Sequence, residues 1–292
     1  MVEEFLDYMR HELNRSEKTV ESYAADLKAF EDFFEGLPGD VSWTTVDADV
    51  IRDWMAFMMD RGNTATSVNR RLSALRSLYR FALAHHLVES DPSFRIRGPK
   101  KEKPLPQFLK ENEMDRLLDQ QQWGDDYRSV LARTIIVLFY ETGMRLSELV
   151  GLDDSSVSFV NCEIKVLGKR NKERIIPFGN EVKETLIRYI QLRDETVNRK
   201  SEGLLLSAKG FRMPPQTIRS IVKNCLAGVS SLKKKSPHVL RHTFATAMLN
   251  HDAGIESLEK LLGHAKLSTT EIYTHTTFEQ LKRVYIEAHP RA

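Results

Sequence analysis

Cysteine is scarce in this chain of 292 residues, which contains only Cys162 and Cys225. The two lie far apart in the sequence and form no Cys-x-x-Cys pair, so neither a thiolate zinc site nor a disulfide framework is indicated. A chain that relies on no disulfide suits a reducing compartment. We therefore expect the protein to act in the cytoplasm.

Long hydrophobic runs are also absent. The longest, residues 134–140, is far shorter than the roughly 20 apolar residues that a membrane-spanning helix requires. The acidic N-terminus leads directly into a helical pattern, which argues against a signal peptide, and we expect no membrane contact. With 41% apolar residues the chain can bury a core, and its length suits two domains of roughly 100–200 residues each.

A large excess of one charge sign is missing too, since the net charge at pH 7 is only +2. The basic residues are nevertheless gathered in patches at residues 61–80, 165–174 and 233–235, and no acidic residue interrupts residues 61–86. Any one patch could be a solvated helix face. Three separate patches are typical of proteins that bind a phosphate backbone, so we expect DNA as the partner.

The first ninety residues are predicted to be helical. Apolar residues recur there at a spacing of three to four, which is typical of helices with one buried face. The helical segments are roughly residues 16–34 with Ser16 as N-cap, residues 47–62 with Asp47 as N-cap, and residues 66–86. On the third segment Arg70, Arg71 and Arg80 lie opposite the apolar face, as in an α-helix that enters the major groove. We therefore expect residues 1–90 to form a DNA-binding domain.

Residues 91–107 differ in character, because they contain four prolines and several basic residues. Each proline disfavours helix at the residue before it. We predict an extended basic linker, in which Lys100 and Lys101 contact DNA. Residues 108–292 are predicted to form a second, mostly helical domain with one β-hairpin, made of residues 163–167 and 173–177. The predicted fold class is therefore mainly α with a small β-hairpin or sheet.

Two motifs of the second domain place cations beside a turn. In Thr142-Gly-Met-Arg-Leu-Ser-Glu148, Gly143 closes one helix and Arg145 begins the next, so that Arg145 and Glu148 share a helix face. In Gly168-Lys-Arg-Asn-Lys172, the hairpin turn presents Lys169. Taken alone, the first motif could be a surface salt bridge and the second a solvated turn.

A third motif, Ser236-Pro-His-Val-Leu-Arg-His242, is suited to the start of a helix. Ser followed by Pro is typical of an N-cap and first helical position. His238 and Arg241 then share a face in the first turns, where free N–H groups and the helix dipole favour an anion such as phosphate. A metal site at His238 and His242 is the alternative. The motif lacks the Glu of a zinc-protease helix and any carboxylate partner, so we expect no metal.

Two further motifs complete the set. In Leu261-Leu-Gly-His264, Gly263 ends a helix and His264 follows it. In the motif that begins at Ser268, this serine and Glu271 form a capping box, which places Tyr273 in a short helix. Taken alone, His264 and Tyr273 could each be structural.

Together the five motifs supply the groups that phosphodiester exchange requires. Fixed guanidiniums stabilise the negative charge that grows on an attacked phosphate. A phenol has a pKa near 10, so a base and cationic surroundings must assist Tyr273 as nucleophile, and the leaving sugar oxygen needs a proton donor. Exchange of one phosphodiester for another conserves bond energy, and no Walker A loop or Mg²⁺-binding carboxylate cluster is present. We therefore expect no ATP, metal or other cofactor.

On these motifs the chain resembles the tyrosine recombinase (phage integrase) family, and most closely its Xer branch. The resemblance covers nearly the whole chain and implies a SAM-like helical core-binding domain, a Pro-rich linker and a catalytic domain, which form a C-shaped clamp on DNA. It implies site-specific recombination through a 3′-phosphotyrosyl intermediate and a Holliday junction. The implied partners are double-stranded DNA with inverted half-sites, a homotetramer or a heterotetramer with a paralogous recombinase, and, as an optional partner, a DNA translocase.

The resemblance also implies which residues would hold the phosphate. Arg145 and Arg241 would bind the scissile phosphate, and His264 would donate a hydrogen bond to one of its oxygens. Glu148 would position the arginine and histidine cluster. These four assignments rest on the match of the motifs.

Proton transfer and attack are assigned in the same way. Tyr273 would form the phosphotyrosyl bond, with His238 as general base or proton shuttle. Lys169, rather than Lys172, falls at the lysine position of the family's hairpin and would protonate the leaving 5′ oxygen. Arg170 stands where a small residue is usual, which adds phosphate affinity and could restrict the loop. Arg170 and Lys172 are expected to contact DNA.

A terminal helix is predicted beyond Tyr273, because Phe278, Leu281 and Tyr285 recur at helical spacing. In the family this tail docks into a neighbouring subunit of a cyclic tetramer. The spacing alone fits equally well a tail that packs on its own domain.

The preferred function is a Xer-like recombinase that resolves chromosome or plasmid dimers. The integrase of a mobile element would have the same active site and a different target. A DNA-binding protein without catalysis would need no nucleophile, so the complete set of catalytic residues argues against it. A type IB topoisomerase shares the chemistry, but the Xer-like N-terminal domain and the tail argue against it.

Overall fold

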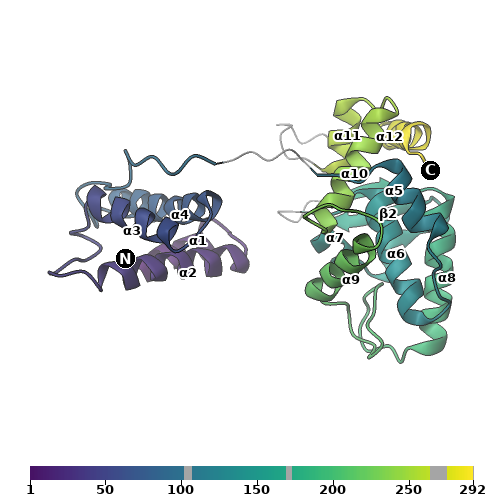
Figure 1. Cartoon of the computed structure of the whole chain (residues 1–292), viewed down its shortest axis with the longest axis horizontal. Coiled ribbons are helices and arrows are strands. Elements are labelled where there is room, and N and C mark those ends of the chain that lie inside the picture. The colour runs from purple at the N-terminus through teal and green to yellow at the C-terminus, as the bar shows by residue number, and fades with distance from the viewer. Residues whose placement is uncertain (102–106, 169–172, 264–274, 292) are drawn as a thin grey trace. The chain divides into compact units, whose positions relative to one another are not determined.

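A computed structural model describes residues 1–101, 107–168, 173–263 and 275–291. The chain divides into two compact units, residues 1–104 and 105–292 (Figure 1). The described part is mainly helical with one small antiparallel sheet, which confirms the predicted fold class. None of its helices is long and apolar enough to cross a membrane.

The first unit is a group of four helices around an aromatic core. They are α1 (Val2–His11), α2 (Glu17–Phe34), α3 (Ala48–Asp60) and α4 (Ala65–Ala84). Ser16 and Asp47 are the N-caps of α2 and α3, as predicted, and the Asp47 carboxylate accepts the first free N–H groups of α3. Phe30, Trp54 and Tyr79 are fully buried between the helices, so their apolar faces supply the packing energy of this unit.

The beginning of the predicted linker packs on this helical core. Ser93 and Ile96 are buried, and the Asn69 side-chain amide donates a hydrogen bond of 2.8 Å to the Pro99 carbonyl oxygen. Lys100 and Lys101 follow directly and are exposed. Residues 93–99 are therefore held against α4, and Lys100 and Lys101 extend into solvent.

The second unit is larger and is built around the buried helix α6. Its elements are α5 (Glu111–Asp115), the π-helix η1 (Arg116–Gln120), α6 (Tyr127–Thr142), α7 (Leu146–Gly151), the 3₁₀ turn η2 (Asp154–Ser156), β1 (Val157–Ser158), β2 (Glu163–Leu167), β3 (Glu173–Pro177), α8 (Asn180–Thr196), α9 (Pro215–Ala227), α10 (Pro237–Asn250), α11 (Ile255–Leu262) and α12 (His275–Ala288). Helix α6 contacts α8, α9 and α10 (Figure 1). Every residue from 134 to 142 is buried, as expected of a helix that is covered on all sides.

The sheet has the strand order β1-β2-β3 and is antiparallel throughout. Strands β2 and β3 are the predicted hairpin. On its buried face Ile164 lies opposite Ile176, and Val166 lies opposite Arg174. Arg174 thus occupies a core-facing position that the alternation of a strand normally gives to an apolar residue.

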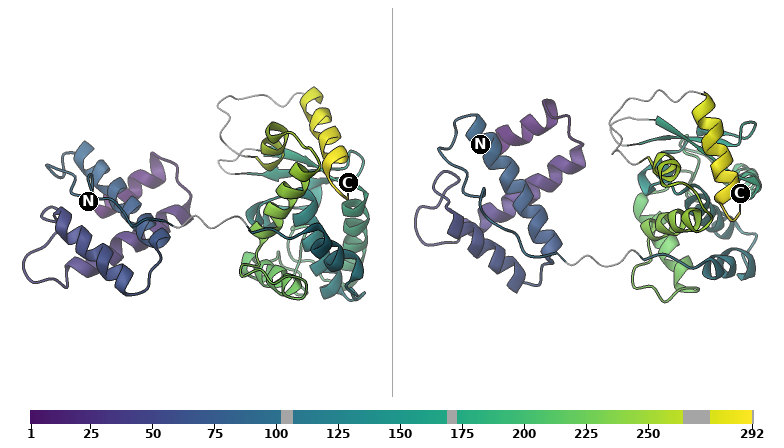
Figure 2. Two further views of the ribbon diagram at one scale, coloured as in Figure 1. Left: turned by 45° about the horizontal axis from the view of Figure 1, so that its top comes forward. Right: turned by 90° about the horizontal axis from the view of Figure 1, so that it is seen from above.

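Helix α12 packs on its own unit, against α10, α11 and β3 (Figure 2). Tyr285 is fully buried and donates a hydrogen bond of 3.2 Å to Oε2 of Glu141. Beyond the helix, Arg291 donates two hydrogen bonds, of 2.9 and 2.6 Å, to the carboxylate of Asp119. In the single chain the tail therefore occupies a site on the domain that carries it.

Glu141 and His289 form a buried pair beneath this tail, with Oε2 and Nδ1 3.2 Å apart. The backbone N–H of Arg291 donates to the same Nδ1, so this nitrogen is an acceptor and the imidazole is neutral. Burial, with the nearby charge of Glu181, raises the pKa of Glu141 to about 8. Burial lowers the pKa of His289 to about 3. At neutral pH the contact therefore joins a carboxylic acid to a neutral ring.

The pair makes stability depend on pH. The raised pKa of Glu141 makes folding less favourable as pH rises from about 4.5 to 8, and the lowered pKa of His289 makes it less favourable as pH falls from about 6.5 to 3. The two effects cancel between pH 4.5 and pH 6.5. Above pH 6.5 only the destabilising effect of Glu141 remains. Between pH 6.5 and 8 the free energy of unfolding of the wild-type protein is therefore expected to fall by about 2 kcal/mol because of Glu141. Glu141→Gln should not show this fall. Urea unfolding at both pH values measures the difference. An unchanged slope in the variant would contradict the assignment.

Candidate functional site

Arg145 is placed by the sharp turn between α6 and α7. Gly143 adopts a left-handed conformation with φ of 57° and closes α6, and a Cβ there would lie 2.4 Å from the Phe244 ring. Arg145 then caps α7, where its backbone N–H donates to Oε2 of Glu148 at 2.6 Å and its Nη1 donates to Oε1 at 2.8 Å. Its side chain is one third exposed (33%), so part of the guanidinium remains open to a ligand.

Glu148 is a buried carboxylate that two arginines share. Arg174 donates to both of its oxygens, with 3.0 Å between Nη2 and Oε2. Burial acts to raise the pKa of Glu148, but the hydrogen bonds and charge of Arg174, together with the bonds from Arg145, hold it below its ordinary value. Glu148 is therefore ionised at neutral pH and fixes the geometry of both guanidiniums.

Arg241 is a buried cation whose hydrogen-bond partners, among the residues that the structure describes, are backbone carbonyls and not carboxylates. It lies in the second turn of α10, whose N-cap is Ser236 and whose first residue is Pro237, as predicted. Its Nη1 donates to the Gly143 carbonyl at 2.5 Å and its Nη2 to the Leu262 carbonyl at 2.7 Å. Burial, and then the charges of Arg145 and Arg174, lower its pKa to about 10, because both disfavour the charged guanidinium.

His238 lies one turn before Arg241 on α10 and is exposed. Burial of part of the ring and the positive charges around it, chiefly those of His242 and Arg241, lower its pKa. The ring is therefore neutral at neutral pH and can accept a proton.

The end of α11 joins the three arginines. Arg174 Nε donates to the Leu261 carbonyl at 3.1 Å, Arg241 Nη2 to that of Leu262, and Arg145 Nη2 to that of Gly263 at 2.9 Å. These are consecutive carbonyls at the C-terminus of a helix, where unpaired acceptors and the negative end of the dipole attract cations. Guanidiniums from three separate elements are thereby held side by side.

This arrangement is suited to an anion with several oxygens. Three guanidiniums face a single carboxylate, so the cluster has an excess of positive charge, and fixed N–H donors of this kind stabilise a phosphate and the charge that develops on it. The described residues include no group of three or more His, Cys, Asp or Glu side chains placed to hold a metal ion. The cluster therefore offers the fixed donors and the surplus of positive charge that could bind a phosphate.

Four of the predicted site residues meet in this cluster: Arg145, Glu148, His238 and Arg241. The other predicted residues, Lys169, Arg170, Lys172, His264 and Tyr273, lie outside the described residues. Arg174 was not assigned a role from the sequence, which placed it only within a basic patch. Its alternation with Ile176 on β3 was the available signal, since it puts Arg174 on the buried face of the strand.

The arginines predicted to contact DNA from α4 are less free than the sequence suggests. Arg70 donates to Ser22 Oγ at 2.8 Å and to the carboxylate of the buried Asp26. Arg71 is half-buried, lies 3.6 Å from Asp26 and donates to the Met58 sulfur. Arg80 is exposed, as expected, and Arg70 stays exposed despite its contacts. The structure thus differs from the expectation of an outward face for Arg71, because a buried carboxylate draws it inward.

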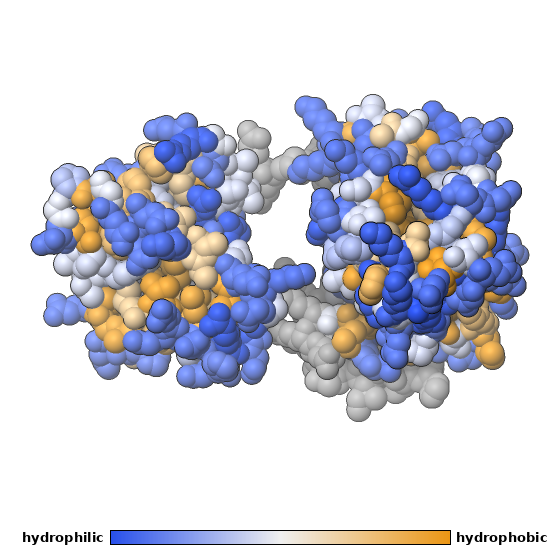
Figure 3. All heavy atoms as spheres, turned by 90° about the horizontal axis from the view of Figure 1, so that it is seen from below, coloured by the Kyte–Doolittle hydropathy of each residue, from blue (hydrophilic) through white to orange (hydrophobic). Residues whose placement is uncertain are grey.

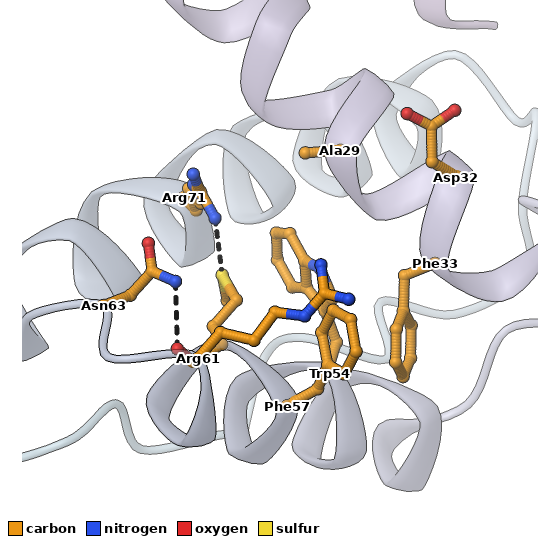
Figure 4. Close-up of a pocket in the computed structure, with 9 residues that line it drawn as sticks. Ala29, Asp32, Phe33, Trp54, Phe57, Arg61, Asn63 and Arg71 are labelled. Carbon is orange, nitrogen blue, oxygen red and sulfur yellow. Dashed lines mark hydrogen bonds between the residues drawn. The ribbon is translucent and has the colours of Figure 1, made fainter.

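A cavity of about 510 Å³ lies in the first unit, whereas the arginine cluster belongs to the second (Figure 4). Trp54, Phe57 and Met58 of α3 line it, and the Arg61 guanidinium lies 4.4 Å from the centre of the Phe57 ring. Apolar residues also reach the surface of this unit, among hydrophilic ones (Figure 3). Of the predicted catalytic residues that the structure describes, Arg145, His238 and Arg241, none lines this cavity.

Comparison with known families finds two matches that together span most of the chain. Residues 2–86 match the N-terminal SAM-like domain of phage integrases. Residues 107–280 match the phage integrase family itself. The second match includes the arginine cluster.

Individual proteins give the same result. A tyrosine recombinase XerC of Chlorobaculum tepidum is 36% identical over an alignment of 315 residues, which covers 99% of this chain and 94% of that protein. A tyrosine recombinase XerD of Oceanobacillus iheyensis is 33% identical over an alignment of 294 residues, which covers 100% of this chain and 98% of that protein. In fold, the chain is similar to XerH site-specific recombinase bound to a palindromic difH substrate, with a TM-score of 0.72, 22% identity, and 97% of this chain and 83% of that one covered.

Proposed function

This chain belongs to the phage integrase family, that of the tyrosine recombinases, and on that premise we propose that it is a Xer-type site-specific recombinase acting on double-stranded DNA. The observation that carries the proposal is the cluster of Arg145, Arg241 and Arg174 around Glu148, with the exposed His238 beside it. Full-length relatives with the names XerC and XerD support the same function.

The proposed reaction exchanges one phosphodiester bond for another. The Tyr273 phenol oxygen forms a bond to the scissile phosphorus, and the bond from phosphorus to the 5′ oxygen breaks. His238, neutral at neutral pH because burial and neighbouring cations lower its pKa, accepts the phenol proton. Lys169 gives a proton to the departing 5′ oxygen. The strand is thereby left joined to the protein through a 3′ phosphate.

The arginines carry the electrostatic part of the proposed mechanism. Arg145 and Arg241 bind the phosphate oxygens as charge accumulates on them, with His264 as a further donor. Each donor of this type contributes roughly 10²–10³ in rate. Because phosphodiester exchange conserves bond energy, we propose that neither ATP nor a metal ion takes part.

The proposed setting is a synapse of two DNA sites with inverted half-sites in the cytoplasm. A homotetramer, or a heterotetramer with a paralogous recombinase, would exchange strands in pairs through a Holliday junction. A DNA translocase would be an optional activator, and resolution of chromosome or plasmid dimers the purpose. Lys100, Lys101, Arg80, Arg170 and Lys172 would contact the phosphate backbone.

The test is to trap covalent protein–DNA adducts in the native host by rapid SDS lysis, and to sequence the DNA attached to the tagged protein. We expect a short segment joined through its 3′ phosphate, with a yield that a chelator does not change. One chromosomal inverted-repeat site would support dimer resolution, whereas the ends of a mobile element would show an integrase. Absence of any adduct would contradict catalysis and favour a DNA-binding protein.

A further inference from the structure

We propose that Arg174 is a positioning residue of the recombination site, which keeps Arg145 available to the scissile phosphate by neutralising Glu148. The inference rests on the proposed function, because Arg145 is a proposed phosphate ligand. Arg174 itself does not touch DNA in this proposal. It acts through Glu148 and through the end of α11.

The hydrogen bonds of Arg174 leave little for a substrate. All three of its guanidinium nitrogens are engaged, Nε with the Leu261 carbonyl and Nη1 and Nη2 with the two oxygens of Glu148. Its side chain is 6% exposed, against 33% for Arg145. The two guanidiniums lie on the same carboxylate, but only that of Arg145 has free surface. Arg174 is therefore placed to hold protein groups.

Stability alone does not explain a charge at this position. Arg174 lies on the buried face of β3 opposite Val166, where an apolar side chain would pack. A buried ion pair is often no more stabilising than apolar residues of similar volume, because both charges must lose their water. Gly263 adds a further constraint, since a Cβ there would lie 3.0 Å from Cδ of Arg174. The sequence thus accommodates a long cation where packing requires none.

The charge matters because of what Glu148 would otherwise do. Oε1 of Glu148 accepts from Nη1 of both Arg174 and Arg145. Without Arg174, Arg145 would be the one cation among the described residues that is hydrogen-bonded to the carboxylate, and the pair would be neutral overall. A phosphate would then compete with Glu148 for the Arg145 donors. With Arg174 present, one positive charge satisfies the carboxylate and another remains for the substrate.

The test compares single-turnover cleavage by the full chain on two synthetic duplexes that carry the site recovered from covalent adducts. One duplex has the ordinary scissile phosphate, and the other has an uncharged methylphosphonate there. Arg174→Gln is expected to cleave the ordinary duplex about 10²-fold more slowly, with DNA affinity unchanged. On the methylphosphonate duplex the loss should shrink to less than about tenfold, because no phosphate charge needs compensation.

Arg193 provides a matched control. It is also a buried arginine, with 1% of its side chain exposed, and it binds both oxygens of Asp154 at 2.7 and 2.9 Å and the Leu204 carbonyl at 2.9 Å. Arg193→Gln should lower the thermal midpoint as Arg174→Gln does and leave cleavage of folded protein unchanged. Arg174→Lys, which keeps one charge, should recover part of the cleavage rate. It also carries the test if Arg174→Gln does not fold.

Three results would overturn the inference. The first is cleavage of the ordinary duplex at the wild-type rate by both Arg174→Gln and Arg174→Lys. The second is an equal loss of cleavage on the two duplexes, and the third is an equally large loss in Arg193→Gln. Failure of the proposed function has a different signature, since the trap in the native host would then recover no adduct and no site, whereas failure of this inference alone leaves the wild-type adduct intact.

Discussion

Tyr273→Phe is expected to bind its DNA site with unchanged affinity and to form no covalent adduct. The substitution removes one oxygen atom, which is the proposed nucleophile, and leaves in place the arginines that we propose bind the phosphate. No other group in the cluster can replace it, because guanidiniums and a neutral imidazole that serves as base do not form the 3′-phosphotyrosyl bond. The measurement pairs a gel shift, for affinity, with an SDS gel of labelled DNA, for the adduct.

Tyr285→Phe is the matched control for this variant. Tyr285 is buried in α12 and donates one hydrogen bond to Glu141, so its loss should lower stability by about 1 kcal/mol and leave the adduct unchanged. An adduct formed by Tyr273→Phe at the wild-type yield would show that another residue attacks the phosphate. Loss of the adduct in both variants would point to a general effect on the C-terminal part of the chain.

Glu148→Gln is expected to have the largest effect on stability, a loss of about 3–5 kcal/mol in the free energy of unfolding. The amide can accept a hydrogen bond but brings no negative charge, so Arg174 is left buried at 6% exposure without a counter-ion. The repulsion among Arg145, Arg174 and Arg241, which already lowers the pKa of Arg241, is then unopposed. Urea unfolding at pH 7 measures the loss.

The dependence on pH and a surface control make this prediction specific. Because the folded chain holds the pKa of Glu148 below its ordinary value of 4.5, its contribution is present above that pH and is lost as pH falls through the folded pKa. The difference between wild type and variant should therefore shrink in acid. Glu173→Gln, which breaks an exposed 2.7 Å pair with Lys165, should change stability by less than about 1 kcal/mol. Equal effects of the two substitutions would contradict the buried role of Glu148.

Local signals made much of the fold predictable. The N-caps Ser16 and Asp47, the Ser236-Pro237 start of α10 and the closing glycines 143 and 263 all act within a few residues of the helix ends that they set. The hairpin followed from alternation on either side of a polar turn. The motifs also brought Arg145, Glu148 and Arg241 together, because the first two share a helix turn and the third matched a family pattern.

The rest depends on partners that are distant in the sequence. Arg174 is 26 residues from Glu148 and 87 from Leu261, and Arg70 is 44 residues from Asp26. Strand alternation could place Arg174 on the buried face, but no local pattern identifies the partner of an arginine when that carboxylate lies in another element. The raised pKa of Glu141 is likewise set by burial and by the charge of Glu181, which lies on another element. The roles of Lys169, His264 and Tyr273 stay predictions.

Asp26 limits the number of counterions that the first unit can displace from DNA in the proposed contact. Arg70 and Arg71 share this one buried carboxylate, so together they bring one net positive charge to a phosphate backbone instead of two. Each phosphate that a protein neutralises on duplex DNA adds about 0.9 to the slope of log affinity against log salt. A count of the arginines on α4 would therefore overestimate the sensitivity of binding to salt. Guanidiniums held in this way contribute to orientation in the groove more than to attraction at a distance.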